Sequence, residues 1–346
     1  MKDMKKIERF IVYGTLVALF AIAAFFDFKI TQSLYNASNA IGRIIEAGAE
    51  VPLFILGIFA LVLIGRNHPT VSKKWVNIAL TVGFCLVAAG LAVYAGRHTT
   101  KLLNRVMGDP NKIKTTLGMI GLGLVYFAGG AGLTYLVKKE QGRQAFLFGI
   151  FVVSVFAIDV LLMQALKMIW LRPRYRTLVA MQEVGIISDV SAYWLPFTHP
   201  QFFTSFKNYQ VGSVLGEHTI TQDEITAVMA KLGIAKWEAE EFYSFPSGHT
   251  MNFVGLLTLT YLPAIFPKLQ SKKNFGLIFR ICVYVVGAVV AFSRILRGAH
   301  NATDVLFAFL LSVIVYDVIS SFLYKDYLLR KFGPKEEEPH AEEAAA

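Results

Sequence analysis

Three clusters of ionisable residues carry the residue types and spacings that catalysis requires, and each borders a long apolar run. They read Lys167-Met-Ile-Trp-Leu-Arg-Pro-Arg-Tyr-Arg, Phe245-Pro-Ser-Gly-His-Thr and Ser293-Arg-Ile-Leu-Arg-Gly-Ala-His-Asn-Ala-Thr-Asp. Together they supply several cations, two imidazoles, a carboxylate and a candidate helix start. This set suits phosphoryl chemistry, because cations and free backbone N–H groups neutralise charged oxygens while a nucleophile attacks phosphorus in line with the leaving oxygen.

The third cluster contains a candidate nucleophile. His300 and Asp304 are four residues apart, so on a helix they share one face. A carboxylate that accepts the proton of one imidazole nitrogen leaves the other nitrogen free to attack. Arg294 stands six residues before His300, and Gly298 permits a turn between them. The alternative interpretation is a structural His–Asp pair at an interface.

The second cluster resembles the start of a helix. Ser247 can cap the helix, and Gly248 lets the backbone approach a ligand closely. The free N–H groups of a helix N-terminus attract phosphate. His249 can donate a proton near neutral pH. An ordinary turn before a helix is the alternative interpretation.

The first cluster places two cations at the end of an apolar run. Lys167 and Arg174 are seven residues apart, so on an unbroken helix they share a face. Pro173 predicts instead that the chain turns near Leu171 or Arg172. Either geometry can direct two cations at one anion, and Arg172 could replace Arg174. A basic end of a membrane span, with its cations reaching for water, is the alternative.

The composition indicates which elements must position these clusters. Of 346 residues, 55% are hydrophobic and 17% are charged, and the formal net charge is +10. Soluble domains carry about 25% charged residues. Lys and Arg lie in short groups between apolar runs, which indicates a membrane protein rather than a disordered or nucleic-acid-binding one. Eight runs predict transmembrane helices, roughly Phe10–Phe26, Val51–Ile64, Val76–Ala95, Leu117–Val137, Ala145–Leu166, Phe253–Phe266, Phe275–Phe292 and Val305–Leu323.

The basic residues predict the orientation of the chain. With both termini in the cytoplasm, the short cytoplasmic segments hold 17 of the 34 Lys and Arg, and all three clusters lie on the non-cytoplasmic side. We expect a multi-pass protein of the plasma or inner membrane, its first run an uncleaved anchor rather than a cleaved signal peptide. Residues 175–244 form an extramembrane insertion, with a capping signature from Thr221 to Glu224 and a helix stop at Gly233. Its aromatic residues serve as interfacial anchors or as a lid over a lipid. Residues 326–346 form a disordered acidic tail.

The spacing of the clusters resembles a known signature. Lys167-x6-Arg174, Pro246-Ser-Gly-His249 and Ser293-Arg294-x5-His300-x3-Asp304 are similar to the tripartite signature of the type 2 phosphatidic acid phosphatases, a superfamily that includes vanadium haloperoxidases and glucose-6-phosphatase. That family usually has proline after the second basic residue, where this chain has Tyr175. The resemblance implies a six-helix phosphatase core over residues 71–325, with residues 1–70 as two accessory helices.

The resemblance also implies a role for each matching residue. His300 would be the nucleophile that forms a phosphohistidine, Asp304 would orient it, and His249 would protonate the leaving group. The residues that would hold the phosphoryl oxygens are Lys167, Arg174, Ser247, Gly248 and Arg294. The resemblance implies neither a metal nor another cofactor, and no carboxylate cluster for Mg²⁺ stands in these motifs.

The expected protein is therefore an all-α, polytopic membrane enzyme. We expect it to hydrolyse a lipid phosphomonoester or diphosphate, such as undecaprenyl diphosphate, phosphatidic acid or phosphatidylglycerophosphate. The expected partners are this lipid phosphate and the bilayer, without nucleic acid; the sequence does not predict an oligomeric state. The alternative is a non-catalytic carrier or transporter that binds phospholipid headgroups. A haloperoxidase is a weaker option, because its known forms are soluble.

Overall fold

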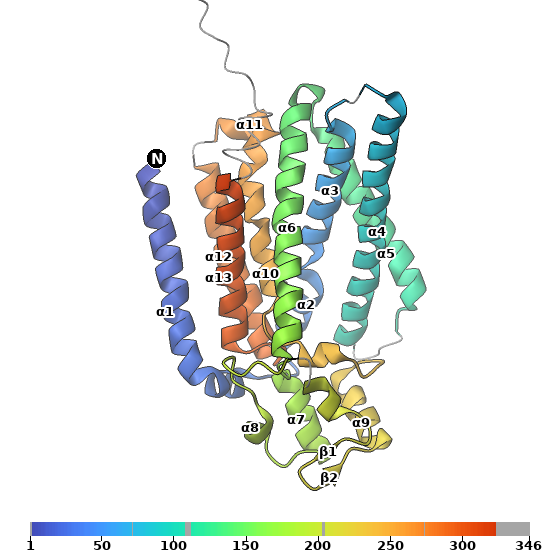
Figure 1. The fold of residues 1–346 in the computed structure, drawn as a ribbon, viewed down its shortest axis with the longest axis vertical. Coiled ribbons are helices and arrows are strands. Elements are labelled where there is room, and N and C mark those ends of the chain that lie inside the picture. The colour runs from blue at the N-terminus through green and yellow to red at the C-terminus, as the bar shows by residue number, and fades with distance from the viewer. Residues whose placement is uncertain (1, 71, 108–111, 203–204, 273, 323–346) are drawn as a thin grey trace, which may run out of the picture.

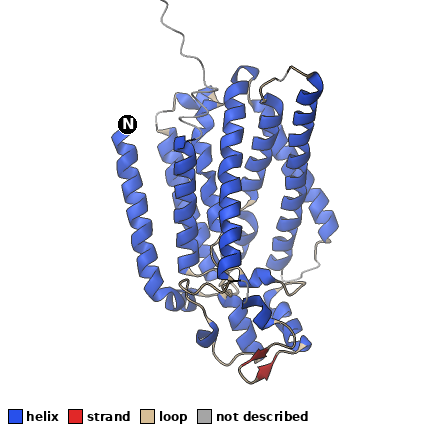
Figure 2. Cartoon of the chain, viewed as in Figure 1, coloured by secondary structure: helices blue, strands red, loops and turns tan. Residues whose placement is uncertain are grey.

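The chain folds into a bundle of long helices with a smaller helical cap at one end (Figure 1). The computed structural model describes residues 2–70, 72–107, 112–202, 205–272 and 274–322. In this part of the chain the only sheet is a two-stranded antiparallel one (Figure 2). These features confirm the predicted all-α membrane bundle.

Within these described ranges, seven helical stretches are long and apolar enough to cross a membrane. The long helices are α1 (Lys2–Leu34), α3 (Val51–Asn67), α4 (Lys74–Val106), α5 (Thr115–Leu133), α6 (Gly142–Trp170), α12 (Phe275–Leu296) and α13 (Ala302–Ile319). The remaining predicted run, Phe253–Phe266, falls on the short helix α10 (Gly248–Val254) and the 3-10 helix η5 (Gly255–Ala264). This run is therefore short and composite, and it is not one of the seven stretches found in the described residues. The predicted end of the last run, Leu323, and the tail at 326–346 lie outside the described residues.

Helix α3 lies at the centre of the bundle, and α4 and α5 lie at its edge. In the most apolar window of each stretch, 78% of the residues are buried for Ala40–Asn67, against 11% for α4 and 17% for α5. The main hydrophobic core is shared by α3, α6, η5 and α13. Helix α1 packs along α13. Of the two helices predicted as accessory, α1 is peripheral and α3 is interior.

The three clusters meet at one end of the bundle. Helix α1 begins at the end opposite the cap, and α2 (Ala40–Gly48) and α3 then return through the interior (Figure 1). The turn after α6, the start of α10 and the connection between α12 and α13 all lie at the cap end. The alternating direction of the helices therefore brings together motifs that are far apart in the sequence.

The cap consists of the described residues between 175 and 244 and has a small hydrophobic core of its own. Its elements are α7 (Tyr175–Val184), α8 (Val190–Tyr193), η3 (Ser205–Tyr209), β1 (Val214–Leu215), β2 (His218–Thr219), α9 (Gln222–Leu232) and η4 (Ala239–Phe242). Thr221 and Glu224 form the predicted capping box, and Gly233 ends α9 with φ +65°. At the other end of the bundle, the short elements are η1 (Thr134–Leu136), η2 (Lys139–Gln141) and α11 (Pro267–Gln270).

Candidate active site

The first cluster lies where α6 ends and the cap begins. Leu171 adopts φ +41°, and its N–H donates to the carbonyl of Lys167 at 3.0 Å. The chain therefore turns just before Pro173, as predicted, because proline disfavours helix in the residue before it. Lys167 stays in the last turn of α6, and Arg174 occupies the N-cap position of α7 in an extended conformation.

Arg172 and Arg174 have different surroundings. The Arg172 guanidinium is buried between helices and lies 2.7 Å from a carboxylate oxygen of both Asp27 and Asp304. The nearest carboxylate to Arg174 belongs to Glu241, at 3.6 Å, and the Arg174 Nε has no hydrogen-bond partner among the described residues. Arg174 rather than Arg172 therefore has donor capacity left for a ligand.

The second cluster forms the start of α10. Ser247 is the N-cap, and its Oγ accepts from the Thr250 N–H at 3.4 Å and the Thr250 hydroxyl at 3.0 Å. These two bonds occupy the oxygen lone pairs and leave the Ser247 hydroxyl proton available to an acceptor. A Cβ on Gly248 would lie 2.8 Å from the Met163 sulfur and 3.4 Å from the Lys167 Nζ. Glycine at this position thus lets α6 and its lysine approach the start of α10 closely.

The third cluster forms the connection between α12 and α13. Gly298 has φ +56°, a left-handed conformation that glycine adopts without strain. The N–H of His300 then donates to the carbonyl of Arg294 at 3.3 Å. Asn301 and Asp304 form a capping box that opens α13. The turn at Gly298 thereby fixes His300 next to the last turn of α12.

The His300 imidazole is held by a backbone carbonyl. Its Nδ1 lies 2.5 Å from the carbonyl oxygen of Ser244, so this nitrogen carries the proton. The Oδ2 atom of Asp304 is 3.9 Å from Nδ1, too far for a hydrogen bond, and accepts instead from the Ser244 hydroxyl and the Asn301 N–H. The direct His–Asp hydrogen bond expected from the spacing is absent. Asp304 acts on His300 through Ser244, and the Nε2 atom of His300 keeps its lone pair.

Three basic residues surround His300. Burial, together with the charges of Arg174, Arg294 and Lys167, holds the pKa of His300 well below its usual range. The imidazole is therefore neutral at pH 7, the state in which it can act as a nucleophile. The Nε and Nη1 atoms of Arg294 are buried and have no hydrogen-bond partner among the described residues. Unpaired buried guanidinium N–H groups are costly, so this arrangement is suited to an anionic ligand.

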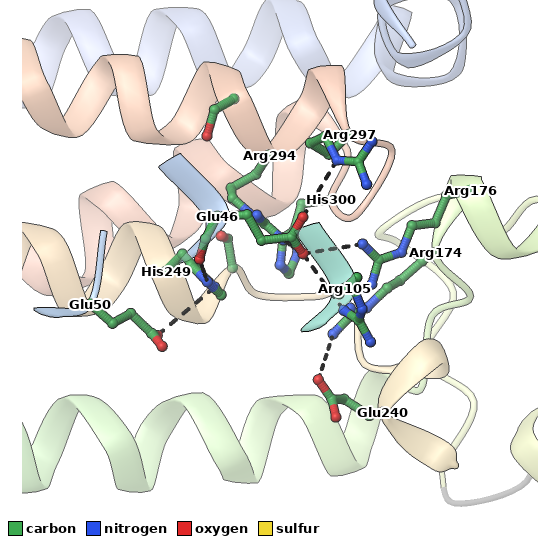
Figure 3. A network of polar contacts seen from close by, with 12 residues as sticks. Glu46, Glu50, Arg105, Arg174, Arg176, Glu240, His249, Arg294, Arg297 and His300 are labelled. Atoms are coloured by element: carbon green, nitrogen blue, oxygen red, sulfur yellow. Dashed lines mark hydrogen bonds and ion pairs between the residues drawn. The ribbon is translucent and has the colours of Figure 1, made fainter. Parts of the chain in front are cut away.

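Glu46, on α2, joins the site from an unexpected part of the sequence. Its carboxylate accepts a hydrogen bond from Arg294 at 3.0 Å and contacts Arg176 at 3.3 Å, Arg297 at 3.4 Å and Arg105 at 3.6 Å (Figure 3). The side chain is almost completely buried. Glu46 thus neutralises part of a dense group of guanidinium ions at the cap end of the bundle.

Two neighbouring carboxylates on the cap complete this network. Glu241 lies 3.1 Å from Arg176 and 3.2 Å from Arg105. Although burial alone would raise it, the pKa of Glu241 lies well below its usual range because of these guanidinium ions and that of Arg174. The charges of Arg174 and nearby basic residues likewise lower the pKa of Glu240 to about 2, against the effect of burial. Both carboxylates are therefore ionised and link the cap electrostatically to the bundle.

His249 lies in the same network as His300 (Figure 3). The His249 Nε2 is 3.1 Å from the backbone carbonyl of Glu46, whose carboxylate binds Arg294. The Nδ1 atom of His249 faces Glu50 at 3.9 Å. The structure therefore brings both predicted imidazoles to one buried polar region.

A cavity of about 390 Å³ borders this region. It lies between the cap end of α4 and residues 233–241. Arg105, Glu240 and Glu241 line it and also belong to the network described above. Further basic lining residues are Arg97, Lys101 and Lys236. Because Glu238 lines it as well, a space with both basic and acidic walls thus lies next to the predicted phosphoryl site.

Three residues of the site, Ser244, Glu46 and Glu50, do not belong to any of the predicted clusters. Ser244 acts through its backbone carbonyl, which no side-chain pattern reveals. Glu46 and Glu50 could have been recognised in the sequence, because both stand just before the second apolar run. Carboxylates at the edge of a membrane span are costly unless they are paired.

Comparisons with known proteins agree with the motif spacing. The chain matches a family model described as PAP2 superfamily over residues 148–327. Phosphatidylglycerophosphatase B of Bacillus subtilis (strain 168) is 31% identical over 98 residues, which are 28% of this chain and 45% of that protein. Phosphatidylglycerophosphatase B of Haemophilus influenzae (strain ATCC 51907 / DSM 11121 / KW20 / Rd) is 33% identical over 90 residues, 26% of this chain and 36% of that protein. The chain thus spans less than half the length of these relatives. No solved structure matches it.

Proposed function

The chain belongs to the PAP2 superfamily, and from this membership and the geometry of the site we propose that it is a membrane phosphatase acting on lipid phosphates. It hydrolyses a phosphomonoester or a diphosphate through a phosphohistidine on His300. The candidate substrates are phosphatidylglycerophosphate, phosphatidic acid and undecaprenyl diphosphate. We favour phosphatidylglycerophosphate among them, because both relatives are named phosphatidylglycerophosphatase B.

One observation carries this proposal: buried guanidinium N–H groups without partners lie beside a neutral imidazole. The free donors belong to Arg174 and Arg294. The charges of both residues act on His300, so they lie close to it. With Nδ1–H bonded to the Ser244 carbonyl, the lone pair of Nε2 is the free nucleophile. Phosphate oxygens satisfy the guanidinium groups and place phosphorus within reach of that lone pair.

The reaction has two steps. The Nε2 atom of His300 attacks phosphorus, the bond from phosphorus to the leaving oxygen breaks, and His249 gives this oxygen a proton. Water then gives a proton to the now neutral His249 and attacks the phosphohistidine, the P–N bond breaks with its electron pair returning to Nε2 of His300, and inorganic phosphate leaves. Lys167, Arg174 and Arg294 stabilise the charge on the phosphoryl oxygens in both steps, and the Gly248 N–H and Ser247 hydroxyl add two donors. These groups take the place of a metal ion in the reaction, so a chelator does not abolish phosphate release.

The position of the site in the bundle favours a lipid substrate. The site lies at the ends of apolar helices, so the acyl or prenyl tail of an amphiphile can stay in the bilayer while its phosphate enters. The described basic residues at the opposite end include Arg66, Lys73, Lys74, Lys138 and Lys268. Because cytoplasmic loops are enriched in Lys and Arg, we propose that this opposite end faces the cytoplasm and that the site faces outward.

The test is a phosphate-release assay in detergent with the three candidate lipids, combined with acid-quench trapping of a labelled phosphoenzyme. The wild-type protein should release phosphate in the presence of a chelator and form an acid-labile phosphoenzyme. His300→Ala should do neither. His218→Ala, which changes an exposed histidine of the cap, is the matched control and should behave as wild type. Normal turnover by His300→Ala would eliminate the mechanism, and lipid binding without phosphate release would favour a carrier.

A further inference from the structure

Glu50, His98 and His249 come from three elements of the bundle and direct their side chains to one point. Their ligand atoms all lie within 4.8 Å of one another. The His98 Nε2 is 2.7 Å from Glu50 Oε2, and the His249 Nδ1 is 3.9 Å from Glu50 Oε1. From this convergence we propose that these three residues form a binding site for a divalent transition-metal ion, with Zn²⁺ as the ion that suits it best.

The ligand set and its dimensions fit such an ion. Two imidazoles and one carboxylate are ligands that Zn²⁺ and its neighbours prefer, whereas Mg²⁺ and Ca²⁺ prefer oxygen ligands alone. Zn²⁺ binds nitrogen at about 2.0–2.1 Å, so the ligand atoms of a tetrahedral site lie about 3.3 Å apart. The separations of 2.7 Å and 3.9 Å bracket this value. The remaining separation, between the ring nitrogens of His98 and His249, is at most 4.8 Å, so all three ligand atoms lie around one point.

The surroundings hold the ligands in place. The other ring nitrogen of His249, Nε2, donates to the carbonyl of Glu46 at 3.1 Å, which leaves the Nδ1 lone pair directed at Glu50. Metal-binding histidines usually have such a partner on their second nitrogen. Asn252 donates to Glu50 Oε1 at 2.8 Å, and the Tyr94 ring stacks on His98 at 5.8 Å. The Glu46 carbonyl, Asn252 and Tyr94 therefore orient the three side chains before an ion binds.

The site also has an entry path. His98 lines the cavity of about 390 Å³ beside the network, and its side chain is 23% exposed. Glu50 is 8% exposed and lies deeper. An ion can thus reach the three ligands through the cavity, and a water molecule or an anion from that side can fill the fourth position.

A bound ion has a consequence for catalysis, and this consequence rests on the proposed function. The general acid must carry protons on both ring nitrogens before it donates one. An ion on Nδ1 of His249 removes this possibility, because that lone pair is then occupied. Zn²⁺ should therefore inhibit phosphate release, and a chelator should restore it.

The proposal is tested by metal binding rather than by activity. Protein without a histidine tag, treated with chelator and kept in detergent, is titrated with Co²⁺, whose visible absorption reports the ligand field, and then with Zn²⁺ as competitor. We expect one ion per chain and at least a 100-fold weaker affinity in His98→Ala. His218→Ala is the matched control, because His218 also pairs with a glutamate, Glu224, at 2.9 Å but is not part of the cluster of three ligands. Its affinity should equal that of wild type.

Two results would overturn the metal site. The first is that Co²⁺ added to the wild-type protein keeps the absorption spectrum of the hydrated ion. The second is that His98→Ala binds Co²⁺ with the same affinity as wild type. Glu50→Gln gives a second measurement if His98→Ala melts at a lower temperature than wild type. Loss of Co²⁺ binding in both variants supports the site even if Zn²⁺ does not inhibit wild type. In that case the metal site stands, and the role of His249 as general acid fails.

Discussion

Arg172→Gln should destabilise the protein far more than Arg174→Gln, although the two residues are neighbours in one motif. The Arg172 guanidinium lies 2.7 Å from the carboxylates of Asp27 and Asp304 and donates to the Thr303 hydroxyl at 3.0 Å. It also lies over the Trp194 ring at 4.8 Å. Glutamine removes the charge and leaves two buried carboxylates close together without a cation between them.

The size of this effect follows from the burial of all three charges. Removing one partner of a buried ion pair costs about 3–5 kcal/mol, because the remaining charge stays desolvated. A loss of 1 kcal/mol lowers the melting temperature by about 2 °C in domains at the upper end of the 150–250-residue range. Arg172→Gln should therefore lower the melting temperature by about 6–10 °C.

Arg174→Gln should lower the stability of the protein only slightly but its kcat strongly. The carboxylates nearest to Arg174 are 3.6 Å and 3.8 Å away, on Glu241 and Glu240, and Glu241 keeps Arg176 as a partner. The loss of stability should stay within about 1 kcal/mol, the size of one ordinary hydrogen bond, because these contacts are long and the Arg174 Nε is already unpaired among the described residues. If Arg174 stabilises the transition state, its loss should lower kcat by about 10²- to 10³-fold, as does the removal of one oxyanion donor.

The assay compares thermal unfolding of both variants in one detergent with phosphate release by the protein that remains folded. Arg172→Gln will also lose some activity, because Asp304 binds the Ser244 hydroxyl that helps position His300. The melting temperature therefore separates the two roles. A melting temperature of Arg172→Gln equal to that of wild type would refute the reasoning, as would an Arg174→Gln protein with wild-type kcat.

Two further predictions concern the pocket itself. Gly248→Ala should lower kcat about 10- to 100-fold, because its Cβ would lie 2.8 Å from the Met163 sulfur and would displace the groups around it. Gly90→Ala is the control, since a Cβ there would meet nothing within 4 Å, and it should match wild type in the same phosphate-release assay. Because burial and nearby cations lower the pKa of His300, and the neutral imidazole is the nucleophile, the acidic limb of kcat/KM assigned to His300 should lie well below pH 6.5. Arg174→Gln removes one of these cations and should move that limb to higher pH, so an unmoved limb would contradict the assignment to His300.

The sequence predicts the scaffold well because its signals are local. Apolar runs predict helices that cross a bilayer, and Pro173 predicts a turn, which the structure shows at Leu171. The capping box from Thr221 to Glu224 is likewise a pattern over a few residues. Even the meeting of the three clusters at one end needs only the alternating direction of successive helices.

The sequence does not predict which groups pair across the site. Glu46 lies 248 residues before Arg294, and no spacing links them. The direction that a side chain takes after a turn depends on the packing of the whole bundle, so Arg172 and Arg174 remain equivalent candidates in the sequence. The spacing of His300 and Asp304 predicts a hydrogen bond between their side chains. In the structure the Asp304 carboxylate instead accepts from the backbone N–H of Asn301, as part of the capping box. These are contacts between elements, and they follow from tertiary packing alone.

The charges of the site suggest why residues outside the matched segment matter to it. The buried network holds five guanidinium groups, those of Arg105, Arg174, Arg176, Arg294 and Arg297. The half-buried Lys167 adds a further positive charge near Arg174 and Arg294. Against them the described contacts place three carboxylates, those of Glu46, Glu240 and Glu241. An excess of positive charge in a buried site is costly without a counter-ion. A phosphomonoester dianion reduces this excess, and Glu46, which precedes the PAP2 match at 148–327, reduces it in the absence of substrate. Without Glu46 the substrate-free site would carry a still larger excess of positive charge. We infer that helix α2, through Glu46, stabilises the site when no substrate is bound. The unpaired donors of Arg174 and Arg294 meanwhile stay available to phosphate.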